Sequence, residues 1–161
     1  MKNEKETTET LTTEPIHRGV GLLIGNEDQT QFFIQIKDNT YPIPQWRGAC
    51  AFWGGAMEPE DVNELAAVLR EVEEEIPAAL PCLNLVEKDK VDTFWVENNG
   101  NPFWLTIFEA VVPNEQLQTI AKVDVLEGNG RLISRAELLS KFWIFGMDFI
   151  FKKYLELKDN R

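Results

Sequence analysis

Histidine and cysteine are almost absent from this sequence: His17 is the single histidine, and Cys50 and Cys82 are the two cysteines. Two cysteines that form no CxxC pair predict neither a disulfide framework nor a zinc site. His17 lies at the end of a polar N-terminal stretch, and we expect no catalytic role for it. Basic residues are also scarce, since 16 Lys and Arg against 27 Asp and Glu leave a formal net charge of −11. This balance argues against general binding of nucleic acid or anionic membrane, because like charges repel phosphate.

Long apolar segments are missing as well. No run approaches membrane-spanning length and the N-terminus has no apolar signal core, so we expect no membrane segment and a reducing, cytoplasmic location. The 161 residues are enough for one domain with a substantial core. Residues 1–14 are mainly Thr, Glu and Lys, which predicts a disordered tail before a single domain over residues 15–161.

Short apolar runs separated by turn residues predict an α+β domain. Runs at 19–25 and 31–37 predict a β-hairpin, the two prolines within 40–48 predict a loop, and residues 49–53 predict a strand that Gly54 and Gly55 end. Composition predicts a helix over 58–76, because acids crowd its first turn and Pro77 follows it. Further strands are expected at 82–88, 91–98, 102–112 and 130–134, and helices at 114–122, 134–141 and 145–157.

The segment REVEEEI, residues 70–76, concentrates four carboxylates, and the apolar run 65–69 lies just before it. On a helix, Glu74 and Glu75 follow Glu71 by three and four residues, so these three share one face, whereas Glu73 points elsewhere. Like charges at these spacings cost about 0.2–0.5 kcal/mol per pair, and a divalent cation would reverse that cost. From the charges alone, a metal site and a solvated acidic face both stay open.

The longer stretch GGAMEPEDVNELAAVLREVEEEIP, residues 54–77, resembles the signature of the Nudix hydrolases. Gly55 matches the signature's first glycine, and its Arg-Glu-aliphatic-x-Glu-Glu core is matched without a gap by Arg70, Glu71, Val72, Glu74 and Glu75. Two positions depart from the pattern. The first acid falls on Asp61, which stands one residue too far from Arg70, and Pro77 replaces the final glycine. A bulge or a later helix start must absorb the extra residue.

The resemblance implies an α/β/α sandwich with a mixed sheet, and hydrolysis of a diphosphate linkage in a nucleoside diphosphate derivative with Mg²⁺ or Mn²⁺ as cofactor. Glu71, Glu74 and Glu75 would be metal ligands, and Asp61 would be a further candidate ligand. Glu71, Glu74 and Arg70 would carry catalysis, with Arg70 orienting a carboxylate by a salt bridge. Gly55 would let the loop turn beside the substrate.

The resemblance also implies that a general base or a further ligand comes from outside the signature. Glu109, Glu115 and Glu127 lie downstream, and Glu127 is preferred because it precedes a loop-to-strand step; for each, a plain surface acid is the alternative. Trp46 and Arg47, in a proline-bearing loop, are the candidates for contact with a small-molecule nucleotide. Phe94 and Phe103 suit either the core or the pocket.

Two other functions stay open. One is a Nudix-fold module that binds or senses a nucleotide without cleaving it, which the displaced Asp61 favours. The other is isomerisation of a diphosphate substrate, for which no convincing acid/base pair is present. The aromatic segment FWIFGMDFIF, residues 142–151, can cover the core or form a homodimer contact.

Overall fold

A seven-stranded mixed β-sheet organises the computed structural model, which describes residues 17–98 and 100–160. The five central strands run in the order β3-β2-β1-β6-β5, while β4 pairs with β1 and β7 pairs with β2. β1 and β6 are parallel, and the other pairs are antiparallel. The strands are β1 (Arg18–Asn26), β2 (Gln31–Ile36), β3 (Cys50–Ala51), β4 (Trp53–Ala56), β5 (Lys90–Val96), β6 (Phe103–Val112) and β7 (Asn129–Ser134).

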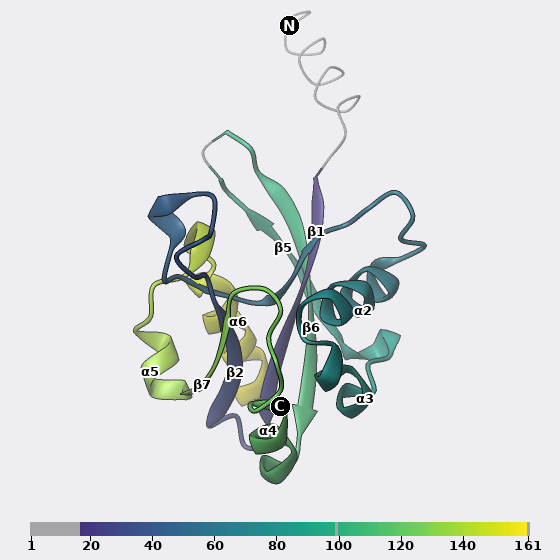
Figure 1. The fold of residues 1–161 in the computed structure, drawn as a ribbon, viewed down its shortest axis with the longest axis vertical. Helices are drawn as coiled ribbons and strands as arrows, with labels where there is room; N and C mark the ends of the chain where they lie inside the picture. Colours follow the sequence, from purple (N-terminus) through teal and green to yellow (C-terminus); the bar gives the residue numbers. More distant parts are fainter. Residues whose placement is uncertain (1–16, 99, 161) are drawn as a thin grey trace, which may run out of the picture.

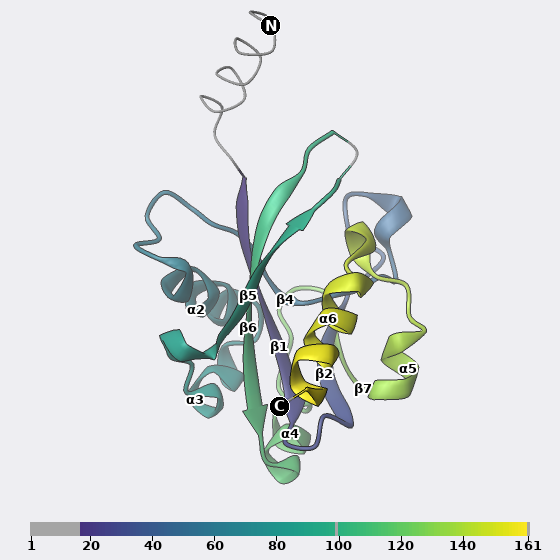
Figure 2. The same ribbon diagram turned by 180° about the vertical axis from the view of Figure 1, so that it is seen from behind.

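Helices cover both faces of the sheet. Figure 1 shows α2 and α3 on one side, and Figure 2, seen from behind, shows α6 lying across β1 and β2. The helices are α2 (Glu64–Glu75), α3 (Leu80–Leu83), α4 (Asn114–Ile120), α5 (Arg135–Leu139) and α6 (Asp148–Asp159), and 3₁₀ turns occupy Pro44–Trp46, Pro77–Ala79, Glu87–Asp89 and Ile144–Gly146. This is the expected α/β/α sandwich.

The alternation of strand side chains builds two separate cores. On β2, Phe32 packs edge-on against Phe151 of α6, with ring centroids 5.1 Å apart. Its neighbour Phe33 points to the opposite face and stacks on Trp53 at the same separation. The first core includes Trp143, Ile144, Met147 and Ile150, so the aromatic segment 142–151 packs into the protein, although Phe142 and Phe149 are partly exposed.

The predicted hairpin and most of the predicted elements are present, but two predictions are wrong. Residues 82–88 are not a strand, because α3 occupies Leu80–Leu83 and a 3₁₀ turn occupies Glu87–Asp89. Pro81 lies in the first turn of α3, where its fixed φ suits a helix. The predicted stop at Gly54-Gly55 is also wrong, since β4 runs through both glycines and pairs them with Gly21 and Val20 of β1.

Helix α2 begins at Glu64, six residues later than expected, and this later start absorbs the extra residue of the signature. The side chain of Asn63 caps the helix by accepting the Ala66 N–H at 2.8 Å. Residues 57–63 therefore form a loop, and Pro77 follows the helix as expected. The proposed tail, 1–14, lies outside the described residues. No helix in the described part of the chain is long and apolar enough to cross a membrane.

Candidate active site on helix α2

The three acids of the signature lie on one face of α2, but they differ in exposure. Glu75 is 1% exposed and Glu71 8%, so both carboxylates enter the protein against β4. The Glu74 side chain is 54% exposed and lies at the rim. Glu73 is exposed on another face, as its helical position predicts. Two buried acids and one exposed acid thus share a site.

Glu75 is fixed through both of its carboxylate oxygens. Oε1 accepts the backbone N–H of Gly54 at 2.8 Å, and Oε2 accepts an N–H of the Gln35 side chain at 3.0 Å. Burial raises the pKa of Glu75 to about 8, and the nearby charges of Glu127 and Glu71 act in the same direction. No cationic side chain bonds to Glu75 within the residues that the structure describes.

Glu71 lies against the backbone of β4 because Gly55 has no side chain. A Cβ atom at Gly55 would stand 2.7 Å from Oε1 of Glu71, a distance that real contacts essentially never show. Burial raises the pKa of Glu71, although the charge of Arg70 opposes the shift. The first glycine of the signature therefore makes room for a carboxylate, and an alanine there would displace it.

Arg70 connects three acids, Asp61, Glu71 and Glu74. Its Nε and Nη2 bind the two oxygens of Asp61 at 3.0 and 2.9 Å, and Nη2 also donates to the carbonyl of Ala56 at 3.1 Å. Its Nη1 lies 3.1 Å from Glu71 Oε1 and 3.2 Å from Glu74 Oε1. The hydrogen bond from Arg70 lowers the pKa of Asp61. Asp61, a candidate ligand from the sequence, is thus held on Arg70 by both oxygens.

Within residues 17–98 and 100–160, no three acidic, histidine or cysteine side chains already form a ligand set for a metal ion. Arg70 Nη1 lies between Glu71 and Glu74, so a cation there requires these side chains to rotate. The chemistry nevertheless fits a hard cation, which prefers oxygen ligands and offsets the charge that burial disfavours. The oxygen Oε1 of Gln35 agrees with such a cation site, because it is a buried acceptor beside Glu75 that makes no hydrogen bond to the described residues.

A cavity of about 300 Å³ lies on the other side of the glycine-bearing strand from these acids. Gly54, Gly55 and Ala56 form its border with the acidic site, and the rings of Phe103 and Phe145 form part of its apolar wall. Polar groups reach it from Lys37, Tyr41, Asn98 and Asn101. The acids and the cavity therefore share the backbone of β4.

Trp46 and Arg47 do not line this cavity. Trp46 stacks on Phe142 and meets Phe145 edge-on, with ring centroids 5.6 and 5.5 Å apart, and Arg47 Nε donates to the carbonyl of Tyr41 at 2.9 Å. Both side chains support residues of the wall from behind. The sequence reasoning missed Lys37, Tyr41, Asn98, Asn101 and Phe145; the position of Lys37 just after β2 was the best available signal.

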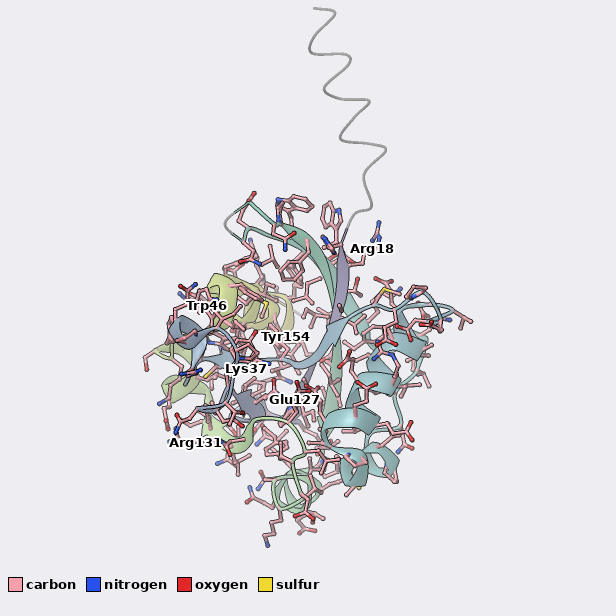
Figure 3. All side chains as sticks on the ribbon, turned by 45° about the horizontal axis from the view of Figure 1, so that its top comes forward. Arg18, Lys37, Trp46, Glu127, Arg131 and Tyr154 are labelled. Atoms are coloured by element: carbon pink, nitrogen blue, oxygen red, sulfur yellow. The ribbon has the colours of Figure 1, made fainter. Side chains whose placement is uncertain are left out.

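Of the three downstream acids, Glu127 lies nearest the site. It is exposed on the loop before β7, its backbone oxygen accepts from Gln35, and with Lys37 it lines a smaller hollow beside the cavity (Figure 3). Glu109 instead pairs with Lys158 at 2.6 Å and accepts from Tyr154 at 3.0 Å. Glu115 lies in the first turn of α4. The geometry thus favours Glu127 over the other two.

A family model described as the NUDIX domain matches residues 15–150. The chain belongs to the NUDIX family. As a Nudix protein it is a hydrolase that acts on phosphoric anhydrides. Family members generally use divalent metal ions, which agrees with the chemistry of the acids on α2.

Solved structures share the Nudix fold at low sequence identity. The MutT protein of Methanosarcina mazei Go1 is 19% identical, with a TM-score of 0.67 over 91% of this chain and 97% of that one. A Caenorhabditis elegans Ap4A hydrolase in a binary complex is 17% identical, with a TM-score of 0.61 over 91% and 100%.

A third structure is the NUDIX domain of Shewanella oneidensis NrtR complexed with ADP ribose, 17% identical with a TM-score of 0.64 over 92% of this chain and 96% of that one. No curated protein sequence matches the chain. At these identities the structures establish the fold, and the activity of each belongs to that protein.

Proposed function

We propose that this Nudix hydrolase cleaves the diphosphate linkage of a nucleoside diphosphate derivative, with Mg²⁺ or Mn²⁺ bound on α2. One observation carries the proposal: the buried carboxylates of Glu71 and Glu75 touch the same glycine backbone that borders the cavity. A nucleoside in the cavity would bring its diphosphate to Gly54 and Gly55. Neither glycine has a side chain, so the backbone can approach the phosphates closely.

A bound divalent cation neutralises phosphate oxygens and lowers the pKa of a coordinated water. Glu71, Glu74 and Glu75 would hold the ion, and Asp61 would keep Arg70 in place rather than bind metal. Glu74, the exposed acid, would turn from Arg70 to bind the ion, and its second oxygen could accept the proton of the attacking water. Glu127 is the second candidate for that proton.

The cavity sets what the nucleoside part can be. Its volume of about 300 Å³ lies at the lower end of ligand pockets, so it suits one nucleoside. Phe103 and Phe145 offer ring contacts for a base, while Lys37 can pair with a phosphate oxygen. Lys37 Nζ now lies 4.9 Å from the centre of the Tyr41 ring.

Incubation of the purified protein with Mg²⁺ and a panel of nucleotide sugars, ADP-ribose, dinucleoside polyphosphates, nucleoside triphosphates and NADH tests the proposal. Release of a nucleoside monophosphate from one of these compounds is the expected result. Tight binding without turnover, in Mg²⁺ and in Mn²⁺, would contradict it and favour a nucleotide-binding module. The likeness to a NUDIX domain complexed with ADP ribose supports the binding of a nucleotide derivative in either case.

A further inference from the structure

Gln35 is a polar residue where the strand pattern requires an apolar one. On β2 it lies two positions after Phe33, so both side chains point to the face that α2 covers. Gln35 is 0% exposed. Burial of an amide costs free energy unless it is hydrogen-bonded, and Gln35 Oε1 has no such bond within the described residues. An apolar side chain would pack here at a lower cost in free energy, which indicates that the amide has a role in the site rather than in packing.

The amide of Gln35 holds two groups of the site at once. Its Nε2 donates to Glu75 Oε2 at 3.0 Å and to the backbone oxygen of Glu127 at 2.9 Å. The backbone oxygen of Glu127 can only accept, so the Gln35 NH₂ group must face it and the orientation of the amide is fixed. Because Gly54 binds the other oxygen of Glu75, the carboxylate is fixed at both oxygens.

The loop before β7 closes over Gln35 and is attached to the same acid. The N–H of Leu126 donates to the backbone oxygen of Glu75 at 2.8 Å. Gly128 has a φ of +73°, and a Cβ there would lie 2.9 Å from the carbonyl oxygen of Ile36 and 3.3 Å from Cγ of Gln35. Glycine at this position lets the loop approach the amide, and one backbone bond and one amide bond then fix the loop to Glu75.

We propose that Gln35 is a positioning residue. It holds the Glu75 carboxylate and the loop around Glu127 in a fixed relative position, so that the carboxylate can bind the metal ion and the loop lies beside the substrate. The inference rests on the proposed function, since it takes Glu75 as a ligand. Groups that orient metal ligands typically contribute about 10–100-fold to metal affinity or activity. Gln35 does not line the cavity, so its loss leaves the nucleoside contacts in place.

The test replaces Gln35 by Met, which keeps the length of the side chain and removes its donors. The control is Gln31→Met on the same strand, which loses only a 3.1 Å bond from Gln118. In the metal-free protein, Mn²⁺ affinity is followed by the paramagnetic resonance signal of free Mn²⁺. We expect Gln35→Met to weaken Mn²⁺ binding about 10-fold or more and lower kcat with little change in KM, and Gln31→Met to match the wild type.

Amide hydrogen exchange gives a readout that does not depend on metal or substrate. In Gln35→Met, the amides of Gly54 and Leu126, both bonded to Glu75, should exchange faster, while core amides such as that of Phe108 keep their protection. If this variant does not fold, Gln35→Asn keeps an amide but withdraws it by one methylene, and the same losses are expected.

Wild-type Mn²⁺ affinity and unchanged exchange in a folded Gln35 variant would overturn the inference. Equal loss of protection throughout the core would also overturn it, because Gln35 would then be an ordinary stabilising residue. Failure of the proposed function has a different signature: the wild type itself would neither bind Mn²⁺ nor release a nucleoside monophosphate, whatever the exchange at Gly54 and Leu126.

Discussion

Glu64 and Glu75 stand at opposite ends of helix α2, and their surroundings differ. Glu64 lies 2.9 Å from Lys90 Nζ and also bonds to the hydroxyl of Thr106. Burial alone would raise the pKa of Glu64, but the bonds from Thr106 and Lys90 outweigh it and the pKa is lowered. Burial raises the pKa of Glu75 to about 8, and the bonds from Gln35 and Gly54 offset this only in part, while Glu127 and Glu71 add to it.

This difference separates a structural acid from a proposed metal ligand on one helix. Glu64 already has its cation and joins α2 to β6 and the start of β5. Glu75 is held by two hydrogen bonds, but among the described residues no cationic side chain bonds to it, and a metal ion would supply the missing positive charge. Identical side chains on one helix thus have different chemistry, and the predictions below test that contrast.

The largest effect is expected at the exposed member of the acid group. Glu74→Gln removes a negative charge and a proton acceptor without disturbing the core, so turnover should fall by about 10²-fold or more. Glu73→Gln is the matched control, because Glu73 is exposed on a different face of the same helix. Steady-state kinetics and thermal unfolding of both variants make the measurement; full activity in Glu74→Gln would remove Glu74 from the site.

The second effect concerns how the free energy of unfolding depends on pH in the absence of metal. The folded pKa of Glu75, about 8, exceeds its ordinary 4.5, so the folded protein binds more protons than the unfolded chain between these values. The free energy of unfolding should therefore fall as pH rises through that interval, by an amount on the order of a few kcal/mol.

Urea unfolding in a chelator, repeated across that interval, makes the measurement. Glu75→Gln should lose this component of the pH dependence, and Mg²⁺ should stabilise the wild type most at the alkaline end. Glu64→Gln should keep it, because the lowered pKa of Glu64 affects stability only under acidic conditions. If Glu75→Gln and the wild type showed the same pH dependence of stability, the contrast between Glu64 and Glu75 in the direction of their pKa shifts would be contradicted.

A smaller effect is expected when the pair at the start of the helix is broken. Glu64→Gln should lower the free energy of unfolding by about 0.2–1 kcal/mol, because the ion pair with Lys90 is partly exposed. Turnover and Mn²⁺ affinity should stay at wild-type values. A loss of Mn²⁺ binding as large as that of Glu75→Gln would show that the ion contacts both ends of α2.

The smallest effect is expected from removal of the extra residue in the signature loop. Val62 is 87% exposed and lies between Asp61, which binds Arg70, and the cap Asn63. Its deletion should leave soluble, folded protein with activity within a fewfold of wild type. Circular dichroism and the hydrolase assay check this, and complete loss of soluble protein would show that the residue is structural.

The sequence predicted α2 and its acidic face because both follow from spacing within one helix, where residues three and four apart meet. It could not show that Gln35 meets Glu75, forty positions away, since only the packing of α2 on the sheet brings them together. Of the cavity lining, the sequence offered Gly55 and Phe103, and most other wall residues were missed because they come from segments far apart in the chain. Residues 82–88 show how an apolar run beside prolines can fold as a short helix.

A crystal soaked in Mn²⁺, with anomalous scattering to locate the ion, tests the central claim most directly. The account predicts density at the oxygens of Glu71, Glu74 and Glu75, with Arg70 Nη1 moved away from Glu74 and Asp61 still bound to Arg70. Absence of density there, with Glu71 and Glu74 still bound to Arg70, would contradict the account.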